Sequence, residues 1–261
     1  MNFLQQFRFI FNYGLLPYAF DGFLSTCSNK AYILTLGLFC LIGGIIAYFL
    51  GSMNFAVIIS KIKFRDDIRR YGSGNAGMTN MLRTYGKAAA AFTLMGDAAK
   101  AIVSVLIGSL LAGEAGAYVA GMFCVIGHSY PIYYGFKGGK GIVVTAATLL
   151  CLEPIVFGIL LLIFVIIVAG TKYLSLGSII VMMIYPVILN SLYPVTHGID
   201  GVPIVPTIVS MLNAAFVVWL HRENIKRLLA GKENKFSLKK TNKFVKAEKE
   251  AEEAEKEAGV K

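Results

Sequence analysis

Charged side chains are scarce in this chain: they make up 15% of its 261 residues, whereas hydrophobic residues make up 56%. An average soluble domain carries about 25% charged residues. The mean hydropathy is +0.66, and uncharged runs approach the roughly 20 residues that a helix needs to cross a bilayer. The composition therefore excludes an ordinary soluble protein and predicts an all-α, polytopic integral membrane protein.

Patterns typical of metal sites and disulfide frameworks are also missing. The chain has four cysteines, and they stand apart in apolar surroundings without metal-ligand spacing: Cys27, Cys40, Cys124 and Cys151. The loops contain no cluster of carboxylates, so we predict no metal ion and no other cofactor. The apolar N-terminal stretch is rich in aromatic residues, contains Pro17 and lacks a small-residue cleavage site, which argues against a cleaved signal peptide.

Apolar stretches of helical length predict seven transmembrane helices. We expect them at about residues 32–59, 88–111, 117–134, 142–152, 155–169, 174–189 and 202–220. Glu153-Pro154 separates the fourth from the fifth, because proline cannot continue a helix. An alternative is one kinked helix over residues 142–169, which leaves six spans. Residues 1–31 are expected to form an N-terminal extension at the membrane interface. Residues 232–261 are expected to form a charged cytoplasmic tail.

Charge asymmetry between the loops predicts the orientation. Loops after the first, third, fifth and seventh spans contain Lys or Arg, whereas the other loops contain Glu114, Glu153 and Asp200 and no basic residue. The positive-inside rule then places the N-terminus outside and the C-terminus in the cytoplasm. The formal net charge of +10 gathers in the basic loops and the tail, which fits an anionic membrane surface or phosphate ligands better than nucleic acid.

The first basic loop contains a glycine-rich run that reads YGSGNAGMTNMLR over residues 71–83. It matches G-x-G-x-x-G, but a dinucleotide fingerprint requires a βαβ unit, and this loop follows a membrane helix. Glycines still allow backbone N–H groups to approach an anion closely. The alternative is a structural turn between helices. The candidate ligand-binding residues of this loop are Gly72, Ser73, Gly74, Asn75, Gly77, Thr79, Asn80 and Arg83.

A second loop, residues 127–141, reads GHSYPIYYGFKGGKG. It lacks the G-x-x-x-x-G-K-[ST] pattern of a nucleotide-binding P-loop, so ATP binding is not predicted. Two lysines among glycines at the start of a helix suit a bound phosphate. The alternatives are a loop that obeys the charge rule and a histidine that packs or caps. The candidate residues are His128, Lys137, Gly138, Gly139, Lys140 and Gly141.

Polar side chains also follow the last span. His221 and Asn224 lie three positions apart on one helical face, and Arg227 lies one turn beyond Asn224. The alternative is an interfacial anchor sequence. Ser178 lies at the inner end of the sixth span, where a serine usually bonds to its own helix. Asp97 and Lys100 are ionisable groups within a span, and such groups usually pair.

These three stretches, in this order, resemble the PlsY family, the bacterial acyl-phosphate-dependent glycerol-3-phosphate acyltransferases. The family motifs G-S-G-N-x-G-x-T-N-x-x-R, G-H-x-x-P-x-x-x-x-F-K-G-G-K-G and H-x-x-N-x-x-R-L correspond to residues 72–83, 127–141 and 221–228. The resemblance covers about residues 45–236. The chain departs from the family at Gly141-Ile-Val-Val-Thr145 and at Asp97-Ala-Ala-Lys100-Ala101, where a glycine is lost.

The resemblance implies transfer of a fatty acyl group from acyl phosphate to the 1-hydroxyl of sn-glycerol 3-phosphate, which gives lysophosphatidic acid and phosphate. It implies no use of acyl-CoA. We expect the protein to be surrounded by membrane lipid and to be a monomer. The H-x-x-x-x-D box of CoA-type acyltransferases is indeed absent, since Tyr133, Val202 and Lys226 stand five residues after the three histidines.

The same resemblance assigns the catalytic centre to Ser73, Arg83, Lys140, His221 and Asn224. The expected substrate-binding residues are Gly72, Gly74, Asn75, Gly77, Thr79, Asn80, His128, Lys137, Gly138, Gly139, Gly141, Ser178 and Arg227. Both substrates carry a phosphate, and Arg and Lys can hold phosphates and offset charge on the leaving group. His221 could orient the glycerol or act as a base, and a substrate phosphate could equally take the proton.

Two other classes of membrane protein remain as alternatives. A transporter of a phosphorylated metabolite also uses broken helices and basic loops, but it needs polar groups near the middle of the bilayer. The polar residues here cluster on one side. A CDP-alcohol phosphotransferase needs a D-G-x-x-A-R type metal motif, and Asp21-Gly22 has no such continuation.

Overall fold

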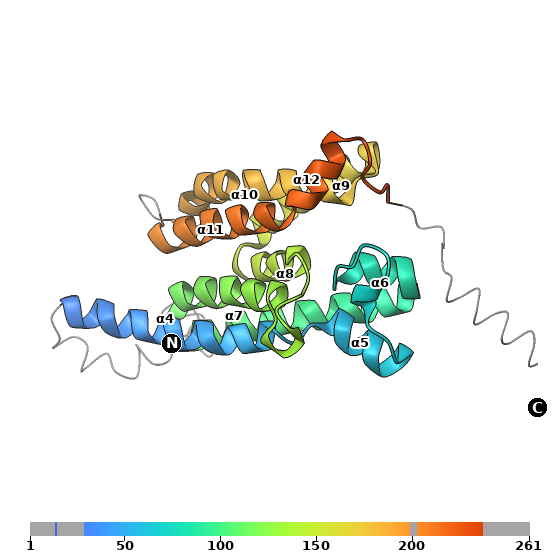
Figure 1. Cartoon of the computed structure of the whole chain (residues 1–261). Helices are drawn as coiled ribbons and strands as arrows, with labels where there is room; N and C mark the ends of the chain where they lie inside the picture. The colour runs from blue at the N-terminus through green and yellow to red at the C-terminus, as the bar shows by residue number, and fades with distance from the viewer. Residues whose placement is uncertain (1–13, 15–28, 199–202, 237–261) are drawn as a thin grey trace, which may run out of the picture.

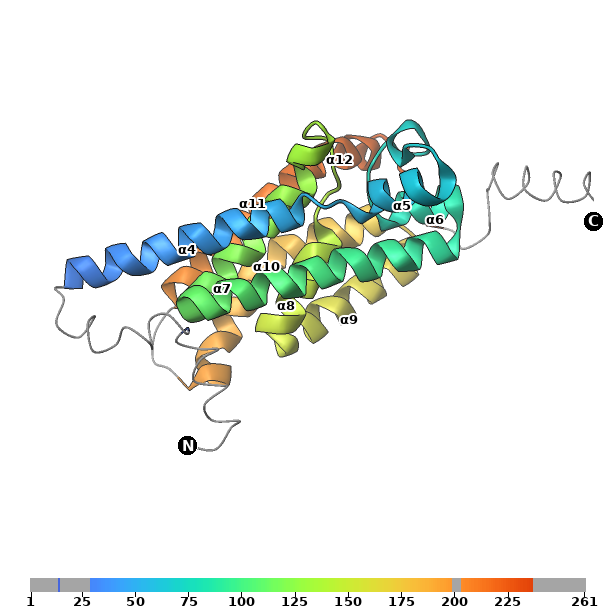
Figure 2. The ribbon, with the colours of Figure 1, turned by 90° about the horizontal axis from the view of Figure 1, so that it is seen from below.

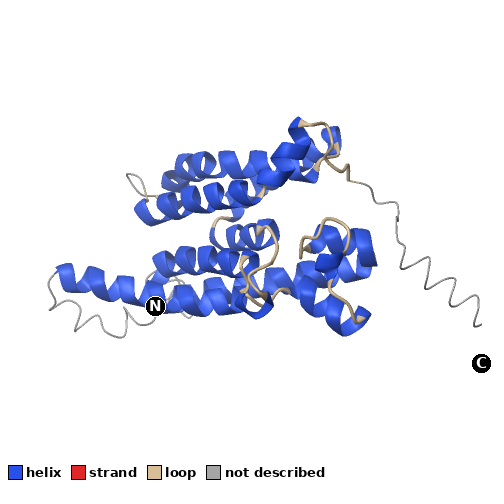
Figure 3. Cartoon of the chain, in the orientation of Figure 1, coloured by secondary structure: helices blue, strands red, loops and turns tan. Residues whose placement is uncertain are grey.

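The computed structural model describes residues 14, 29–198 and 203–236. Over these residues the chain is helical and contains no strand (Figure 3), which confirms the all-α prediction. The helices are α4 (Asn29–Gly51), α5 (Phe55–Phe64), α6 (Met78–Tyr85), α7 (Lys87–Ser129), α8 (Ile142–Leu152), α9 (Pro154–Thr171), α10 (Leu174–His197), α11 (Ile204–Leu220) and α12 (Arg222–Leu229). The predicted extension lies almost entirely outside the described residues, as does the tail from residue 237 onward.

Four helical stretches of the described chain are long and apolar enough to cross a membrane: Lys30–Phe64, Lys87–Tyr134, Pro154–Thr171 and Leu174–His197. A fifth is added if α11 and α12, which meet at a bend of 56°, count together. Large apolar side chains on the outer surface, such as Leu34 (73% exposed) and Ile166 (62% exposed), suit contact with lipid. The protein is therefore a membrane protein, as predicted.

Within the stretch Lys30–Phe64, helix α4 ends at Gly51, whereas the sequence predicted an unbroken span to about residue 59. A Cβ on Gly51 would lie 2.3 Å from the carbonyl oxygen of Cys124, so α4 meets the backbone of α7 here. A new helix, α5, starts after Asn54, whose Oδ1 accepts a hydrogen bond from the N–H of Val57 (3.1 Å). A side-chain cap of this kind separates two helices that hydropathy alone joins.

Helix α7 contains the second and third predicted spans. The backbone is non-helical at Ala112 and Gly113, where Gly113 has φ +59°. A Cβ on Gly108 would lie 2.3 Å from the carbonyl oxygen of Gly116. Residues eight apart are separated by about 12 Å along a straight helix, so the chain must reverse at the break. The two halves run antiparallel (Figure 2), with the break near the predicted Gly113–Gly116 boundary.

The break at Glu153 lies where proline predicted it, with α8 before it and Pro154 at the first position of α9. The two-helix interpretation of residues 142–169 therefore describes the structure. The predicted end of the sixth span at about residue 189 is wrong, because α10 continues to His197 through Pro186 and Pro194. Asn190 Nδ2 donates to the carbonyl of Pro186 (2.7 Å), and membrane helices tolerate proline where such groups satisfy the backbone.

The helices form two layers (Figure 1): α9–α12 form one, and α4, α7 and α8 form most of the other. The main core includes Tyr118, Val125, Val144, Leu189 and Val217. The short helices α5, α6 and α12 lie toward the same end of the molecule in both Figures 1 and 2. The two glycine loops also meet there, and this end carries the candidate site.

Candidate functional site

The buried side chain of Asn80 stabilises the first glycine loop from helix α6. Its Oδ1 accepts a hydrogen bond from the N–H of Ser73 (3.0 Å), and its Nδ2 donates to the carbonyls of Ile68 and Tyr71. Gly72 has φ +58°, and a Cβ there would lie 2.2 Å from Asn80 Oδ1. Only glycine fits this position. Asn80 therefore shapes the loop, and the Ser73 residue stays exposed above it.

The second loop folds back on the end of α7. The N–H of Gly138 donates to the carbonyl of Ser129, and the N–H of Gly139 donates to that of His128 (both 3.1 Å). The N–H of Ala76 in the first loop donates to Gly138 O (3.4 Å). A Cβ on Gly139 would lie 2.0 Å from His128 Nε2 and 2.8 Å from Ala76 O. The two loops are thus in direct contact and leave no room for a side chain at this point.

Arg69, which lies just before the first glycine loop, connects it to the second loop. Its Nη1 donates to the carbonyls of Tyr134 (2.6 Å) and Lys137 (3.0 Å), and Asp67 pairs with its Nη2 at 2.7 Å. Sequence reasoning missed this residue, because a loop arginine on the basic side is fully explained by the charge rule.

Lys140, α12 and Glu233 meet in one hydrogen-bonded network. Lys140 Nζ donates to Asn224 Oδ1, and Asn224 Nδ2 donates to Glu233 Oε1 (2.8 Å). Arg227 Nε donates to Glu233 Oε2 (2.7 Å), and Ser175 Oγ donates to Glu233 Oε1 (2.9 Å). The expected boundary after residue 231 would assign Glu233 to the tail, whereas its contacts place it with the site. None of the three sequence motifs includes Glu233, so its acidic side chain was the only signal in the sequence.

The electrostatics of the network favour an anion. Burial, and next the charge of Arg227, lower the pKa of Lys140 to about 8, and Arg83 contributes in the same direction. Burial opposes ionisation of Glu233, but its bonds from Arg227, Asn224 and Ser175 lower its pKa overall. Two arginines thus act on the charge of Lys140, with Glu233 as a partial counterion. A phosphate would relieve this repulsion.

His221 lies between α11 and α12, buried beside this network. Its Nδ1 lies 2.8 Å from the carbonyl oxygen of Val217. A carbonyl can only accept, so Nδ1 carries the proton and Nε2 carries the lone pair. Burial lowers the pKa of His221 to about 4, and Lys140 acts in the same direction. The imidazole is therefore neutral at physiological pH, and its Nε2 can accept a hydrogen bond from a hydroxyl group.

Some predicted residues have other contacts. His128 lies in a buried cluster with Lys100 (Nζ to Nδ1, 3.0 Å) and Asp97 (Oδ1 to Nδ1, 3.4 Å). Ser178 Oγ donates to the carbonyl of Leu174 (2.9 Å), the usual bond of a serine in a membrane helix. Lys137 is exposed on the outside of its loop.

The remaining predicted residues lie around the two loops. Gly74 and Gly141 have φ +70° and +79°, and Gly141 precedes the first turn of α8. Gly77 precedes α6, which carries Thr79 and Arg83 half-buried. Asn75 is half-buried, and its Nδ2 would lie 3.1 Å from a Cβ on Gly77.

An apolar cavity begins at Ile142, in the first turn of α8 and two positions after Lys140 in the sequence. It has an empty volume of about 550 Å³, part of it open to the outside, between α8, α9 and α10. Its walls include Ile142, Leu149, Phe157, Leu161, Phe164 and Met182. Sequence reasoning missed it, because apolar side chains at helical spacing give no sign of the space between helices.

Comparison with known families decides the relationship of this chain. Its sequence matches the model of the family described as glycerol-3-phosphate acyltransferase over residues 41–231. The chain belongs to this family. A glycerol-3-phosphate acyltransferase of Thermoanaerobacter pseudethanolicus is 41% identical over 202 residues, which cover 77% of this chain and 98% of that protein. One of Agrobacterium fabrum is 38% identical over 198 residues, 76% of this chain and 92% of the relative.

Two solved structures of PlsY, an integral membrane glycerol 3-phosphate acyltransferase, share the fold. The glycerol 3-phosphate form has a TM-score of 0.67 and 32% identity, and it covers 76% of this chain and 96% of PlsY. The lysophosphatidic acid form has a TM-score of 0.65 and 31% identity with the same coverage. The family predicted from the three motifs is confirmed.

Proposed function

We propose that this protein transfers a fatty acyl group from acyl phosphate to the 1-hydroxyl of sn-glycerol 3-phosphate, with lysophosphatidic acid and inorganic phosphate as products. The observation that carries the proposal is the convergence of Lys140, Asn224 and Arg227 from two distant segments beside the first glycine loop. The family relationship supports the acceptor. The choice of donor rests on the motifs and on a site rich in phosphate-binding groups.

In the proposed reaction, the 1-hydroxyl oxygen attacks the acyl carbonyl carbon, and the bond from this carbon to the phosphate oxygen breaks. Phosphate leaves and takes up the bonding electrons, and the hydroxyl proton passes to His221 Nε2 or to a phosphate oxygen. Lys140 and Arg83 offset the negative charge of the leaving phosphate. Ser73 and the loop N–H groups bind a phosphate or the acyl carbonyl oxygen.

The apolar cavity between α8, α9 and α10 suits the fatty acyl chain. Its lining near the loop starts at Ile142, two positions after Lys140, so a chain in the cavity would place its head group at the cationic network. Burial of apolar chain there contributes about 0.8 kcal/mol per CH₂. The proposed lipid substrate thus has an apolar site next to a polar one.

We propose that the seven apolar helical segments all cross the membrane, with the N-terminus outside and the site on the cytoplasmic side of the bacterial cell membrane. The domain would comprise residues 32–231 together with Glu233, and it would act as a monomer. The clustering of both glycine loops and α12 at one end supports this topology. The variants Glu114→Cys and Lys137→Cys, each with this single cysteine and labelled in intact cells, test the topology. Only Glu114→Cys should react with an impermeant maleimide.

The reaction is tested with purified protein, palmitoyl phosphate and glycerol 3-phosphate, by measuring phosphate release and lysophosphatidic acid together. Palmitoyl-CoA serves as the parallel donor. Equimolar products with palmitoyl phosphate alone are expected. Product from palmitoyl-CoA alone would overturn the donor, and no product from either donor would overturn the function. Uptake of glycerol 3-phosphate into proteoliposomes without chemistry would instead favour a transporter.

A further inference from the structure

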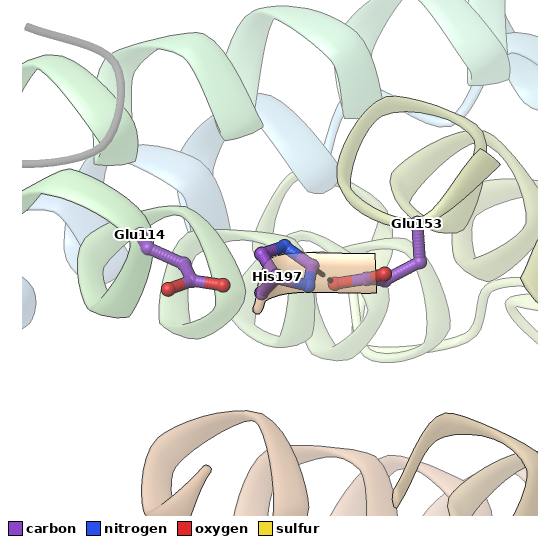
Figure 4. A group of neighbouring side chains, drawn as sticks. All are labelled: Glu114, Glu153 and His197. Atoms are coloured by element: carbon purple, nitrogen blue, oxygen red, sulfur yellow. Dashed lines mark ion pairs between the residues drawn. The ribbon is translucent and has the colours of Figure 1, made fainter. Parts of the chain in front are cut away.

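A second group of polar side chains lies away from the two glycine loops (Figure 4). Glu114 follows the break in α7, Glu153 separates α8 from α9, and His197 is the last residue of α10. One carboxylate oxygen of each glutamate and one ring nitrogen of His197 all lie within 4.8 Å of one another. In Figure 4 the imidazole lies between the two carboxylates.

The hydrogen bonds of His197 leave Nε2 as an acceptor. Its Nδ1 lies 3.3 Å from the carbonyl oxygen of Tyr193 and 2.9 Å from Thr196 Oγ1. The carbonyl cannot donate, so Nδ1 carries the proton and Nε2 carries a lone pair. This lone pair faces Glu153 Oε1 at 3.8 Å. Two acceptors that face each other need a proton or a cation between them.

The segments of the chain that carry these three side chains contain no Lys or Arg. Residues 101–136, 141–171 and 173–221 contain neither Lys nor Arg. Glu153 is only 3% exposed. A buried carboxylate is normally paired or bound to a cation. The nearby donors are neutral: Tyr118 OH donates to Glu153 (2.7 Å), and Tyr193 OH donates to Glu114.

The three ligand atoms, which lie at separations of up to 4.8 Å, must draw together to hold one metal ion. Zinc ligands lie about 2.0–2.2 Å from the ion, which places tetrahedral ligand atoms about 3.4 Å apart. The separation of His197 Nε2 from Glu153 Oε1 is 3.8 Å. Tyr118 and Tyr193 already orient the carboxylates, as outer-shell groups of metal sites do. The side chain of His197 is 35% exposed, which leaves a path for an ion.

We propose that Glu114, Glu153 and His197 form a binding site for one divalent transition-metal ion of the Zn²⁺ type, separate from the proposed acyltransferase site. One imidazole and two carboxylates form a donor set suited to such ions. The ion joins three helix ends, those at the break in α7, between α8 and α9, and at the end of α10. Its role is structural. The expectation of no metal considered each loop alone, and the predicted sixth span ended at residue 189, before His197.

The test uses the full chain in detergent without any polyhistidine tag, stripped with EDTA. Zn²⁺ is then titrated by isothermal calorimetry, bound metal is counted by mass spectrometry, and the melting temperature is measured with and without the ion. We expect one Zn²⁺ per chain and a higher melting temperature. Wild-type protein that binds no stoichiometric Zn²⁺ would overturn the proposal.

Variants assign the ligands. Glu114→Gln and Glu153→Gln keep an oxygen that accepts from the neighbouring tyrosine, and His197→Ala changes a partly exposed helix end. Each should weaken Zn²⁺ binding at least tenfold and abolish the rise in melting temperature. The control Glu223→Gln removes an exposed carboxylate of α12 and should bind normally. If Glu153→Gln does not fold, His197→Ala decides: unchanged binding in this variant would contradict the site.

Discussion

Lys140 and Asn224 are joined by a side-chain hydrogen bond although they lie 84 positions apart. Asn224 also donates to Glu233, so it links the cation of the second glycine loop to the one carboxylate of the network. The amide orients Lys140 without neutralising it. Lys140 therefore keeps a charge to offer to a phosphate.

Lys140→Ala should lower kcat/KM for acyl transfer at least tenfold. Loss of a hydrogen bond to a charged partner costs about 1.5–3 kcal/mol, which corresponds to roughly 10–100-fold. Phosphate release with palmitoyl phosphate as donor measures the effect. Lys226→Ala is the matched control, because this lysine of α12 is 72% exposed and pairs with Glu223. Equal rates for the two variants would rule out the proposed role of Lys140.

The lowered pKa of Lys140 predicts an alkaline limit on activity. The ammonium form exists below about pH 8 in the free protein, so kcat/KM should fall as the pH rises through this value. The pH at which kcat falls should be higher than the pH at which kcat/KM falls, because a bound phosphate stabilises the ammonium form of Lys140. A phosphate monoester titrates near pH 6 and cannot cause the alkaline limb.

Lys140→Arg separates this explanation from a general loss of activity. A guanidinium stays protonated beyond pH 12. The variant should be slower, since a guanidinium differs in shape from an ammonium, but its alkaline limb should disappear. A limb that stays near pH 8 in Lys140→Arg would assign the titration to another group.

Glu233→Ala should lower both activity and stability. Its carboxylate accepts hydrogen bonds from Ser175, Asn224 and Arg227, and it is buried, with 7% side-chain exposure. Removal frees α12 from α10 and leaves the cations of the site without this counterion. The melting temperature in detergent and the rate of acyl transfer report the two effects. Glu223→Ala, whose side chain is 57% exposed, should leave the melting temperature nearly unchanged.

Helix breaks were predictable where the signal is local. Pro154 and Gly113 separate helices by their own backbone preferences, and both breaks lie where the sequence placed them. The end of α4 at Gly51 was not predictable. It depends on Lys100, whose Nζ donates to the carbonyls of Gly51 and Met53 (2.9 Å each) from 49 and 47 positions away. Likewise, α10 continues past Asn190 because a side chain satisfies its backbone.

The candidate site shows the same division. The motifs supplied Lys140, Asn224 and Arg227, which the structure joins through hydrogen bonds. Glu233 and Arg69 were missed, because each acts through a partner that only the folded chain brings near. The apolar cavity is a property of the space between three helices, and no residue pattern encodes it.

The buried cluster of Asp97, Lys100 and His128 should behave as a structural unit. Lys100 Nζ lies 2.8 Å from Asp97 Oδ1, and both side chains are at most 3% exposed. Lys100→Met removes the nearest cation from a buried carboxylate, which costs about 3–5 kcal/mol, and it also leaves two carbonyls without a donor. The melting temperature should fall sharply. The exposed Lys87 at the start of α7 provides the control Lys87→Met, which should melt normally.

The double variant Asp97→Asn with Lys100→Met tests the pairing itself. Once the carboxylate is neutral, loss of the ammonium costs less, so the combined destabilisation should be smaller than the sum of the two single effects. Additive effects would show that the two side chains stabilise the fold independently, contrary to the contact in the structure.

Gly139→Ala should reduce acyl transfer at least tenfold while the helices stay folded. The added Cβ would lie 2.0 Å from His128 Nε2 and 2.8 Å from Ala76 O, so the loop must move away from both. The shift propagates to Lys140, the next residue, and misplaces its ammonium relative to Asn224. The rate of phosphate release, compared with the melting temperature, separates this local effect from unfolding. Gly158→Ala is the control, because a Cβ there meets nothing within 4 Å and alanine is a better helix former; equal loss of activity in both variants would contradict a specific role for the loop.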